Sequence, residues 1–308
     1  MMILKNTKKN TNKKIIFADV SLIFIALIRG SSFVAVKDIL QNITPFYVIA
    51  IRFGFASILL SLIFYKKLKK INKYDIKAGF IIGAFLFSAF AAQTIGLQYT
   101  TAGKQAFLTT LYVIVIPFLV WIKNKDKLDT WSILAAVLAL IGIGFLTINN
   151  DLKMSLNLGD WLTLLCAILF ACHIVAISYF SKSMDSIILT ILQMGFAGFI
   201  AFICALIFEP KFTGINNITL IPIIYLIFVC TMINFLIQNI AQKYTHPNHV
   251  GILLCLESVF GAILSIIFLK DIFSLNMVIG CVIIFISIII SETKLSFLKP
   301  YISKKSIQ

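Results

Sequence analysis

The segment Gln93-Thr-Ile-Gly-Leu-Gln-Tyr99-Thr100 has a counterpart 145 positions later, Gln238-Asn-Ile-Ala-Gln-Lys-Tyr244-Thr245, so a Gln-x5-Tyr-Thr pattern occurs once in each half of the 308-residue chain. The same offset places Lys125-Asp126 on Lys270-Asp271, and an offset of 141 places Asp19 on Asp160. Chance could supply one such pair. Collinear pairs over most of each half indicate a duplicated sequence.

The composition indicates that lipid is the main solvent of this chain. Apolar residues make up 60% of it and charged residues only 13%, and the mean hydropathy is +1.01. Soluble domains are nearer half apolar and a quarter charged. The formal net charge of +15 could suggest a nucleic-acid partner. The basic residues lie between apolar segments rather than on a polar domain, so we expect no binding of nucleic acid.

Ten apolar runs are each long enough to cross a bilayer, which takes about 20 mostly apolar residues. They are residues 17–36, 45–65, 77–97, 103–122, 130–148, 160–180, 186–208, 219–240, 249–269 and 272–291. The sequence therefore predicts an all-α membrane protein.

An odd number of spans in the first half makes the second half enter the membrane upside down. Inverted repeats of this kind are typical of secondary transporters, whose binding site lies near the midplane between the repeats. We expect a basic tail over 1–16, a first five-helix repeat over 17–148, a linker over 149–159, a second five-helix repeat over 160–292 and a basic tail over 293–308. Two related halves also favour alternating access.

The lysines predict the orientation in the membrane, since cytoplasmic loops are rich in basic residues. Twenty lysines lie on the side of the termini and the even-numbered loops, against five in the odd-numbered loops. Both termini are therefore expected in the cytoplasm, and the chain in the inner or plasma membrane of the cell.

Four ionisable residues lie at membrane depth, where charges are costly and are functional candidates. At 1.5 Å per residue, Arg29 and Arg52 are expected in the outer half of the membrane, and His173 and Glu257 in the inner half. Two cations face one acid, so a carboxylate or phosphate on a substrate would supply the missing charge. Glu257 and His173 are the candidates for proton coupling. Structural pairing between helices is the alternative for each residue.

Uncharged polar residues extend the candidate substrate site. They are Gln93, Tyr112, Gln193, Asn234 and Gln238. Tyr112 and Glu257 are equivalent in the repeat, which predicts mirrored depths on facing helices. Hydrogen bonds between helices could also explain the amides. Pro117 is expected to kink the fourth span.

Signatures of nucleotide, metal or hydrolytic chemistry are missing from the sequence. It has neither a GxxxxGK[S/T] phosphate loop nor an HExxH motif, and its six cysteines lack the spacing of metal ligands. We therefore expect no cofactor, no metal and no enzymatic activity.

Several motifs resemble EamA-type members of the drug/metabolite transporter superfamily. They are Gly30-Ser-Ser-Phe-Val-Ala-Val-Lys37 with Pro45 and Arg52, Gly96-Leu-Gln-Tyr99-Thr-Thr-Ala-Gly103 running into Ala106–Val113, and Leu256-Glu-Ser-Val-Phe260 before Lys270-Asp271. The resemblance covers residues 17–292. It implies a ten-helix carrier, often an exporter, with a cavity formed by helices 1–4 and 6–9. Arg52 and Glu257 match an arginine and a glutamate of the family, whereas Arg29 stands where the family usually has Trp.

The sequence thus predicts a secondary transporter that exports a small polar metabolite such as an amino acid. Its expected partners are the lipid bilayer and the substrate, and protons are the candidate coupling ion. A monomer or weak homo-oligomer would suffice. Transport of xenobiotics or nucleoside-like metabolites is one alternative, and an intramembrane enzyme for a lipid-linked substrate is another. A channel would need a continuous polar stripe along a helix, and the polar residues are expected to be isolated. A membrane scaffold would not need two buried arginines.

Overall fold

A computed structural model describes residues 2–124, 130–147, 156–244 and 247–293, with the side chains of 2–16 left aside. The described residues form helices joined by short connections. The helices of the first half are α1 (Met2–Ile39), α2 (Pro45–Ile63), α3 (Tyr65–Leu68), α4 (Lys73–Gly96), α5 (Ala102–Thr109), α6 (Tyr112–Asn124) and α7 (Thr130–Thr147). Those of the second half are α8 (Leu158–Phe180), α9 (Ser186–Phe208), α10 (Asn217–Ile227), the π-helix η1 (Phe228–Ile233), α11 (Asn234–Gln242), α12 (Pro247–Leu269) and α13 (Leu275–Thr293).

The expected ten spans correspond to ten apolar helical stretches. Seven are long and apolar enough to cross a membrane: Phe17–Ile39, Pro45–Ile63, Lys73–Gly96, Ala102–Ile122, Leu158–Phe180, Ser186–Phe208 and Asn217–Gln242. Three shorter apolar helices, Ile133–Phe145, Leu253–Leu269 and Leu275–Ser287, occupy the other expected positions. The predicted all-α membrane fold is therefore confirmed. Residues 149–155 of the expected linker over 149–159 and residues 294–308 of the expected tail over 293–308 lie outside the described residues.

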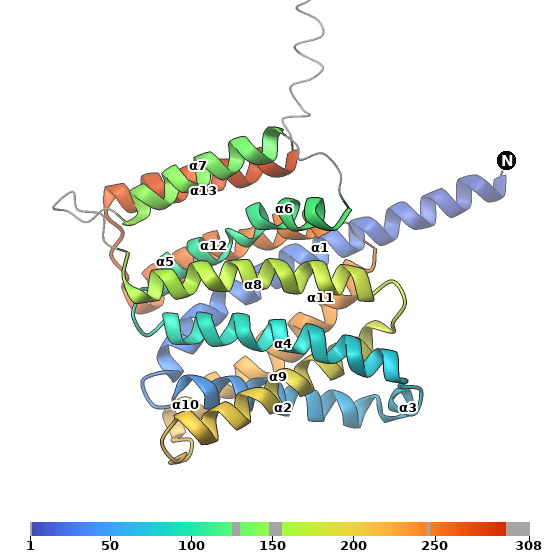
Figure 1. Ribbon diagram of the computed structural model, residues 1–308, viewed down its shortest axis with the longest axis horizontal. Helices are drawn as coiled ribbons and strands as arrows, with labels where there is room; N and C mark the ends of the chain where they lie inside the picture. Colours follow the sequence, from blue (N-terminus) through green and yellow to red (C-terminus); the bar gives the residue numbers. More distant parts are fainter. Residues whose placement is uncertain (1, 125–129, 148–155, 245–246, 294–308) are drawn as a thin grey trace, which may run out of the picture.

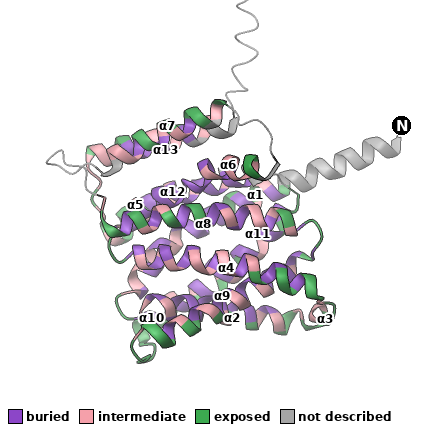
Figure 2. Ribbon diagram, in the orientation of Figure 1, coloured by how far each residue is buried: buried purple, intermediate pink, exposed green. Residues whose placement is uncertain are grey.

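The surface of the bundle is apolar, as a lipid solvent requires. Phe199 is 62% exposed, Phe208 72% and Ile221 75%. Conversely, Arg52, Glu257 and many amide and hydroxyl side chains are buried. Figure 2 shows the buried residues concentrated in the middle of the bundle, with exposed residues on α7 and around α3 and α10. The interior is still largely apolar, as in a soluble protein, so the apolar surface is what distinguishes this bundle.

The two halves run in opposite directions through the bundle. α1 ends beside the place where α8 begins, because Lys37 Nζ of α1 donates to the Thr100 carbonyl at 2.8 Å and the Thr100 hydroxyl donates to Asp160 of α8 at 3.1 Å. α1 and α8, the first helices of the two halves, are therefore antiparallel (Figure 1). This is the inverted arrangement that the odd span count predicts.

The packing of the helices follows the same two-fold relation. α2 packs on α9, α7 on α13 and α5 on α12, and in each case the two partners occupy equivalent positions of the two halves. The first half's α1 packs on α12, and the equivalent α8 of the second half packs on α5 and α6. In the same way, the packing of α4 on α8 is repeated by the packing of α10 and α11 on α1. The pair α7–α13 lies at one edge of the bundle (Figure 1).

Several helices begin at a side chain that satisfies their free backbone N–H groups. Asn72 and Asp75 form a capping box at the start of α4, and Asn157 and Asp160 form one at the start of α8. Such reciprocal caps bond two N–H groups that a helix leaves unpaired. They fix where these spans begin after the polar connections.

Two spans are interrupted near their middle. The fourth is divided at Thr110 and Leu111, seven and six residues before Pro117, and Pro117 itself lies inside α6. The Thr110 hydroxyl donates to the Phe107 carbonyl at 2.8 Å, the acceptor that the Leu111 N–H would use in a regular helix, and that N–H bonds Leu108 instead. The eighth span contains the π-helix η1, a feature frequent at functional sites.

Candidate functional site

A small polar cavity lies where the two halves meet inside the membrane-spanning region. Its lining residues come from both halves: Arg29, Ser32, Phe33, Arg52, Phe90, Gln93, Cys230, Asn234 and Glu257. About 10 Å³ is open to the centre of a water molecule, which is space for roughly one water. Both arginines and the glutamate that the sequence singled out therefore surround one cavity.

Arg29 on α1 and Glu257 on α12 form a buried ion pair between Nε and Oε2. The two side chains are 9% and 1% exposed. Arg29 Nη1 also donates to Gln238 Oε1 at 3.3 Å, and its guanidinium lies 5.6 Å from the ring centre of Phe170. The depths counted for Arg29 and Glu257 thus differ by no more than their long side chains can span, and the contact joins the two candidates directly.

Arg52 on α2 is a buried cation, 3% exposed, without a carboxylate partner among the described residues. Its Nε donates to Thr231 Oγ1 at 3.0 Å, and its Nη2 lies 3.5 Å from the Cys230 carbonyl. Both acceptors belong to η1. The rings of Phe90 and Phe53 lie 4.6 and 5.1 Å from the guanidinium carbon. Neutral oxygens and aromatic faces hold Arg52 in place, so its charge is not compensated.

Some polar atoms around the cavity have no hydrogen-bond partner among the described residues. They are Glu257 Oε1, Tyr112 Oη and Asn234 Oδ1. Tyr112 is fully buried and lies within electrostatic range of Glu257 and Arg29. Tyr112 and Glu257 therefore lie close together, while the mirrored membrane depths expected for them stay a prediction. Asn234 Oδ1 lines the cavity and is thus placed to bind water or a polar ligand, whereas Tyr112 and Glu257 also interact with each other.

His173 and Gln193 form a separate buried pair. His173 Nε2 lies 3.0 Å from Gln193 Oε1, and the imidazole stands between the rings of Phe170 and Phe235. Neither residue lines the cavity. Gln93 does line it, with its Nε2 3.4 Å from Thr109 Oγ1. The structure therefore gathers Arg29, Arg52, Gln93, Tyr112, Asn234, Gln238 and Glu257, and places His173 and Gln193 beside them as a second pair.

Sequence reasoning missed Ser32, Cys230 and Thr231. Ser32 follows Arg29 by three residues on the same helix, a spacing that puts both on one face, so this signal was available. Cys230 and Thr231 meet Arg52 because η1 exposes a carbonyl and a hydroxyl to it, and no residue pattern marked that π-helix.

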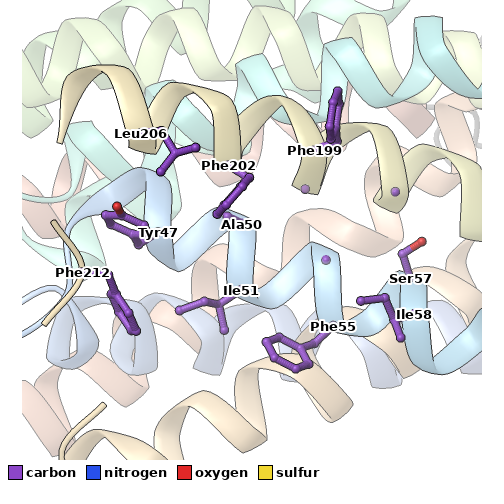
Figure 3. Close-up of a pocket in the computed structure, with 13 residues that line it drawn as sticks. Tyr47, Ala50, Ile51, Phe55, Ser57, Ile58, Phe199, Phe202, Leu206 and Phe212 are labelled. Atoms are coloured by element: carbon purple, nitrogen blue, oxygen red, sulfur yellow. The ribbon is translucent and has the colours of Figure 1, made fainter. Parts of the chain in front are cut away.

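Two larger pockets lie on the outside of the bundle. The groove between α2 and α9 measures about 600 Å³ and is lined by Phe55, Phe199, Phe202 and other apolar side chains (Figure 3). Tyr47 and Ser57 are its hydroxyl-bearing residues, and the Ser57 hydroxyl donates to the Ile191 carbonyl at 3.0 Å. A second groove of about 500 Å³ lies between α1, α10 and α12. The α2–α9 groove offers a surface for lipid rather than for a polar ligand.

Comparison with known proteins gives consistent results over almost the whole chain. The EamA-like transporter family matches twice, at residues 16–148 and 157–293. An uncharacterized transporter of Archaeoglobus fulgidus is 33% identical over 277 residues, which cover 90% of this chain and 86% of that protein. The uncharacterized transporter YetK of Bacillus subtilis is 26% identical over 304 residues, covering 90% and 88% of the two chains.

A solved crystal structure has the same fold, with a TM-score of 0.66 at 15% identity, covering 89% of this chain and 96% of that one. The double family match agrees with the internal repeat and with the two-fold packing of the helices. The chain therefore belongs to the EamA-like transporter family.

Proposed function

We propose that the protein is a secondary transporter that exports a small metabolite carrying a carboxylate, such as an amino acid, by alternating access around the midplane cavity. The observation that carries this proposal is Arg52, a buried cation beside the cavity that forms no ion pair with an acid among the described residues. An unpaired charge inside a protein is costly unless a partner arrives. A guanidinium matches a carboxylate in shape and charge and can bind it through two parallel hydrogen bonds.

The charge of the cluster supports an anionic group on the substrate. Arg29 and Glu257 compensate one another, so the cluster of Arg29, Arg52 and Glu257 carries one net positive charge. A carboxylate at Arg52 would make it neutral. In a zwitterionic substrate the ammonium group adds a positive charge back, and the oxygens of Asn234 and Glu257 could accept hydrogen bonds from it.

Contacts at the two ends of the α2–α9 pair support alternating access. At one end the Glu209 carboxylate accepts from the Thr44 hydroxyl at 2.7 Å and from the N–H of Phe46 at 2.7 Å. At the other end Lys67 Nζ donates to Asp185 Oδ2 at 2.6 Å. The first contact joins the C-terminal end of α9 to the start of α2, and the second joins α3, which follows α2, to the start of α9. Breaking one of them while keeping the other would open the cavity toward one side only.

Glu257 is the group on which we place proton coupling. Its Oε2 pairs with Arg29, and the Tyr112 hydroxyl interacts with the same carboxylate. Protonation would remove the negative charge from the pair and release Arg29 to interact with a substrate anion. His173 pairs with Gln193 and does not line the cavity, so it has no part in this step.

Efflux from proteoliposomes tests the proposal. Liposomes containing the purified protein are loaded with an equimolar mixture of the twenty amino acids, and the external solution is analysed over time. We expect the wild type to release at least one of them faster than empty liposomes, Arg52→Gln to fall to the leak rate, and the exposed Lys66→Gln to behave as wild type. Release by Arg52→Gln at the wild-type rate, or no release by the wild type, would refute the proposal.

A further inference from the structure

The helix α11 carries a row of buried amide side chains. Asn234, Gln238, Asn239 and Gln242 are 2%, 1%, 0% and 3% exposed. Positions 234, 238 and 242 are separated by four residues each, which places them above one another on one face of the helix. The expectation that polar residues in the spans are isolated is therefore wrong for α11. We call these four residues the amide row.

The amide row is poorly satisfied by the rest of the protein. Asn239 Nδ2 donates to Thr190 Oγ1 of α9 at 2.7 Å, whereas Asn239 Oδ1 and both polar atoms of Gln242 have no hydrogen-bond partner among the described residues. A buried amide without partners costs about 1–3 kcal/mol. Amides placed only to hold helices together would be bonded to a neighbouring helix. Gln242 is bonded to none that the structure describes.

The amide row starts at the polar cavity and runs toward one membrane face. Asn234 lines the cavity, and Gln238 bonds Arg29. From Asn234 to Gln242 the row extends about 12 Å along the helix axis. The eighth span returns the chain to the side on which α1 begins, so the row leads from the cavity toward that side.

The equivalent part of the first half lacks such a row. The offset of 145 places the amide row on Ala89, Gln93, Thr94 and Leu97 of α4. The positions equivalent to Asn234 and Gln242 are thus apolar. The duplicated fold therefore does not require the amide row. The row is present in the second half alone, so it makes the two ends of the transport route different.

We propose that the amide row lines the half of the substrate path between the cavity and the membrane face on the side of α1's start. This inference rests on the proposed transport function and specifies its route. In a state open to that side, water and the substrate would bond the amides that are unpaired here. Amides both donate and accept and carry no charge, so the row would pass the amino and hydroxyl groups of a substrate without competing with Arg52 for its carboxylate.

Thiol accessibility tests this route without a known substrate. Single cysteines are placed at 239 and 242 in a variant whose six native cysteines are replaced by alanine. Ile240→Cys is the matched control, because Ile240 is on the same helix between them and is 42% exposed on the outer surface. The probe is the negatively charged sulfonatoethyl methanethiosulfonate, and the readout is the mass of the protein over time.

We expect the cysteines at 239 and 242 to react on the order of ten times faster than that at 240, because the reagent needs a thiolate, which forms in water and not in lipid. Equal rates at 240 and 242 would overturn the inference and leave the role of Arg52 untouched. If Arg52→Gln releases amino acids at the wild-type rate while the cysteine at 242 is labelled fast, the role of Arg52 would be refuted and the inference about the amide row would stand.

A second measurement separates a path from a structural contact. Gln242→Leu should melt at or above the wild-type temperature, because it replaces a buried amide without partners by an apolar side chain. In the efflux assay with the amino-acid mixture it should transport at least about tenfold more slowly. A lowered melting temperature with unchanged efflux would show a structural role and overturn the inference.

Discussion

Replacing Glu257 by glutamine should destabilise the protein far more than its small change of shape suggests. Glutamine fills the same space but leaves Arg29 without its partner, in a site where both side chains are less than a tenth exposed. Breaking a buried ion pair by neutralising one member costs about 3–5 kcal/mol, because the other charge stays buried. The net charge of the cluster rises from one to two, and Arg29 and Arg52 are close enough to repel each other.

For a chain of this length each kcal/mol corresponds to about 2 °C in melting temperature, so Glu257→Gln should melt roughly 6–10 °C below wild type. The measurement is thermal unfolding of the purified protein in detergent, followed by its tryptophan fluorescence. The double variant Arg29→Gln/Glu257→Gln removes both charges and should recover most of the loss. If the loss of melting temperature in the double variant equals the sum of the losses in the two single variants, the two residues are not coupled and the reasoning is refuted.

Three further changes probe the packing and the contacts at the ends of α2 and α9. Gly83→Ala should lower the melting temperature, because a Cβ there would lie 2.7 Å from the Phe196 Cβ, whereas Gly54→Ala, with no atom within 4 Å, should leave it unchanged or raise it. Glu209→Ala should cost about 0.5–2 kcal/mol in unfolding experiments by removing the cap of α2, and Glu209→Gln less; equal effects of the two would contradict the capping role. Lys67→Met should cost less than about 1 kcal/mol at pH 7, because its pair with Asp185 is 39% exposed. Partial burial alone would raise the pKa of Asp185, but the hydrogen bonds from Lys67 and from the Ile187 N–H outweigh it and lower that pKa below 3.8. The stability from this pair is therefore present above about pH 4 and lost as the pH falls through the lowered pKa, so wild type and Lys67→Met should converge in melting scans at low pH.

The fold could be predicted from the sequence because each span is set by local composition. Twenty apolar residues must form a helix in lipid, and an odd number of spans per repeat dictates inversion whatever the side-chain packing is. The repeat of Gln93 and Tyr99 at Gln238 and Tyr244, together with the other collinear pairs, located the two halves.

The contacts within the site were harder to predict, because they depend on the tilt and register of helices far apart in sequence. Arg29 and Glu257 are 228 residues apart, and an error of a few residues at each helix end moves a depth estimate by several ångströms. The π-helix that brings Thr231 to Arg52 changes the register of the eighth span. The amide row, by contrast, was readable from the spacing of Asn234, Gln238 and Gln242 alone.

The most direct test of the central claim is the affinity of the purified protein for a transported amino acid and for its amide, measured by titration calorimetry in wild type and in Arg52→Gln. If Arg52 binds the carboxylate, the wild type binds the acid on the order of 100-fold more tightly than the amide, because a buried charged pair contributes about 3 kcal/mol to binding. Arg52→Gln loses that preference. Equal affinity of the wild type for the acid and its amide, or an unchanged preference in Arg52→Gln, would contradict the claim.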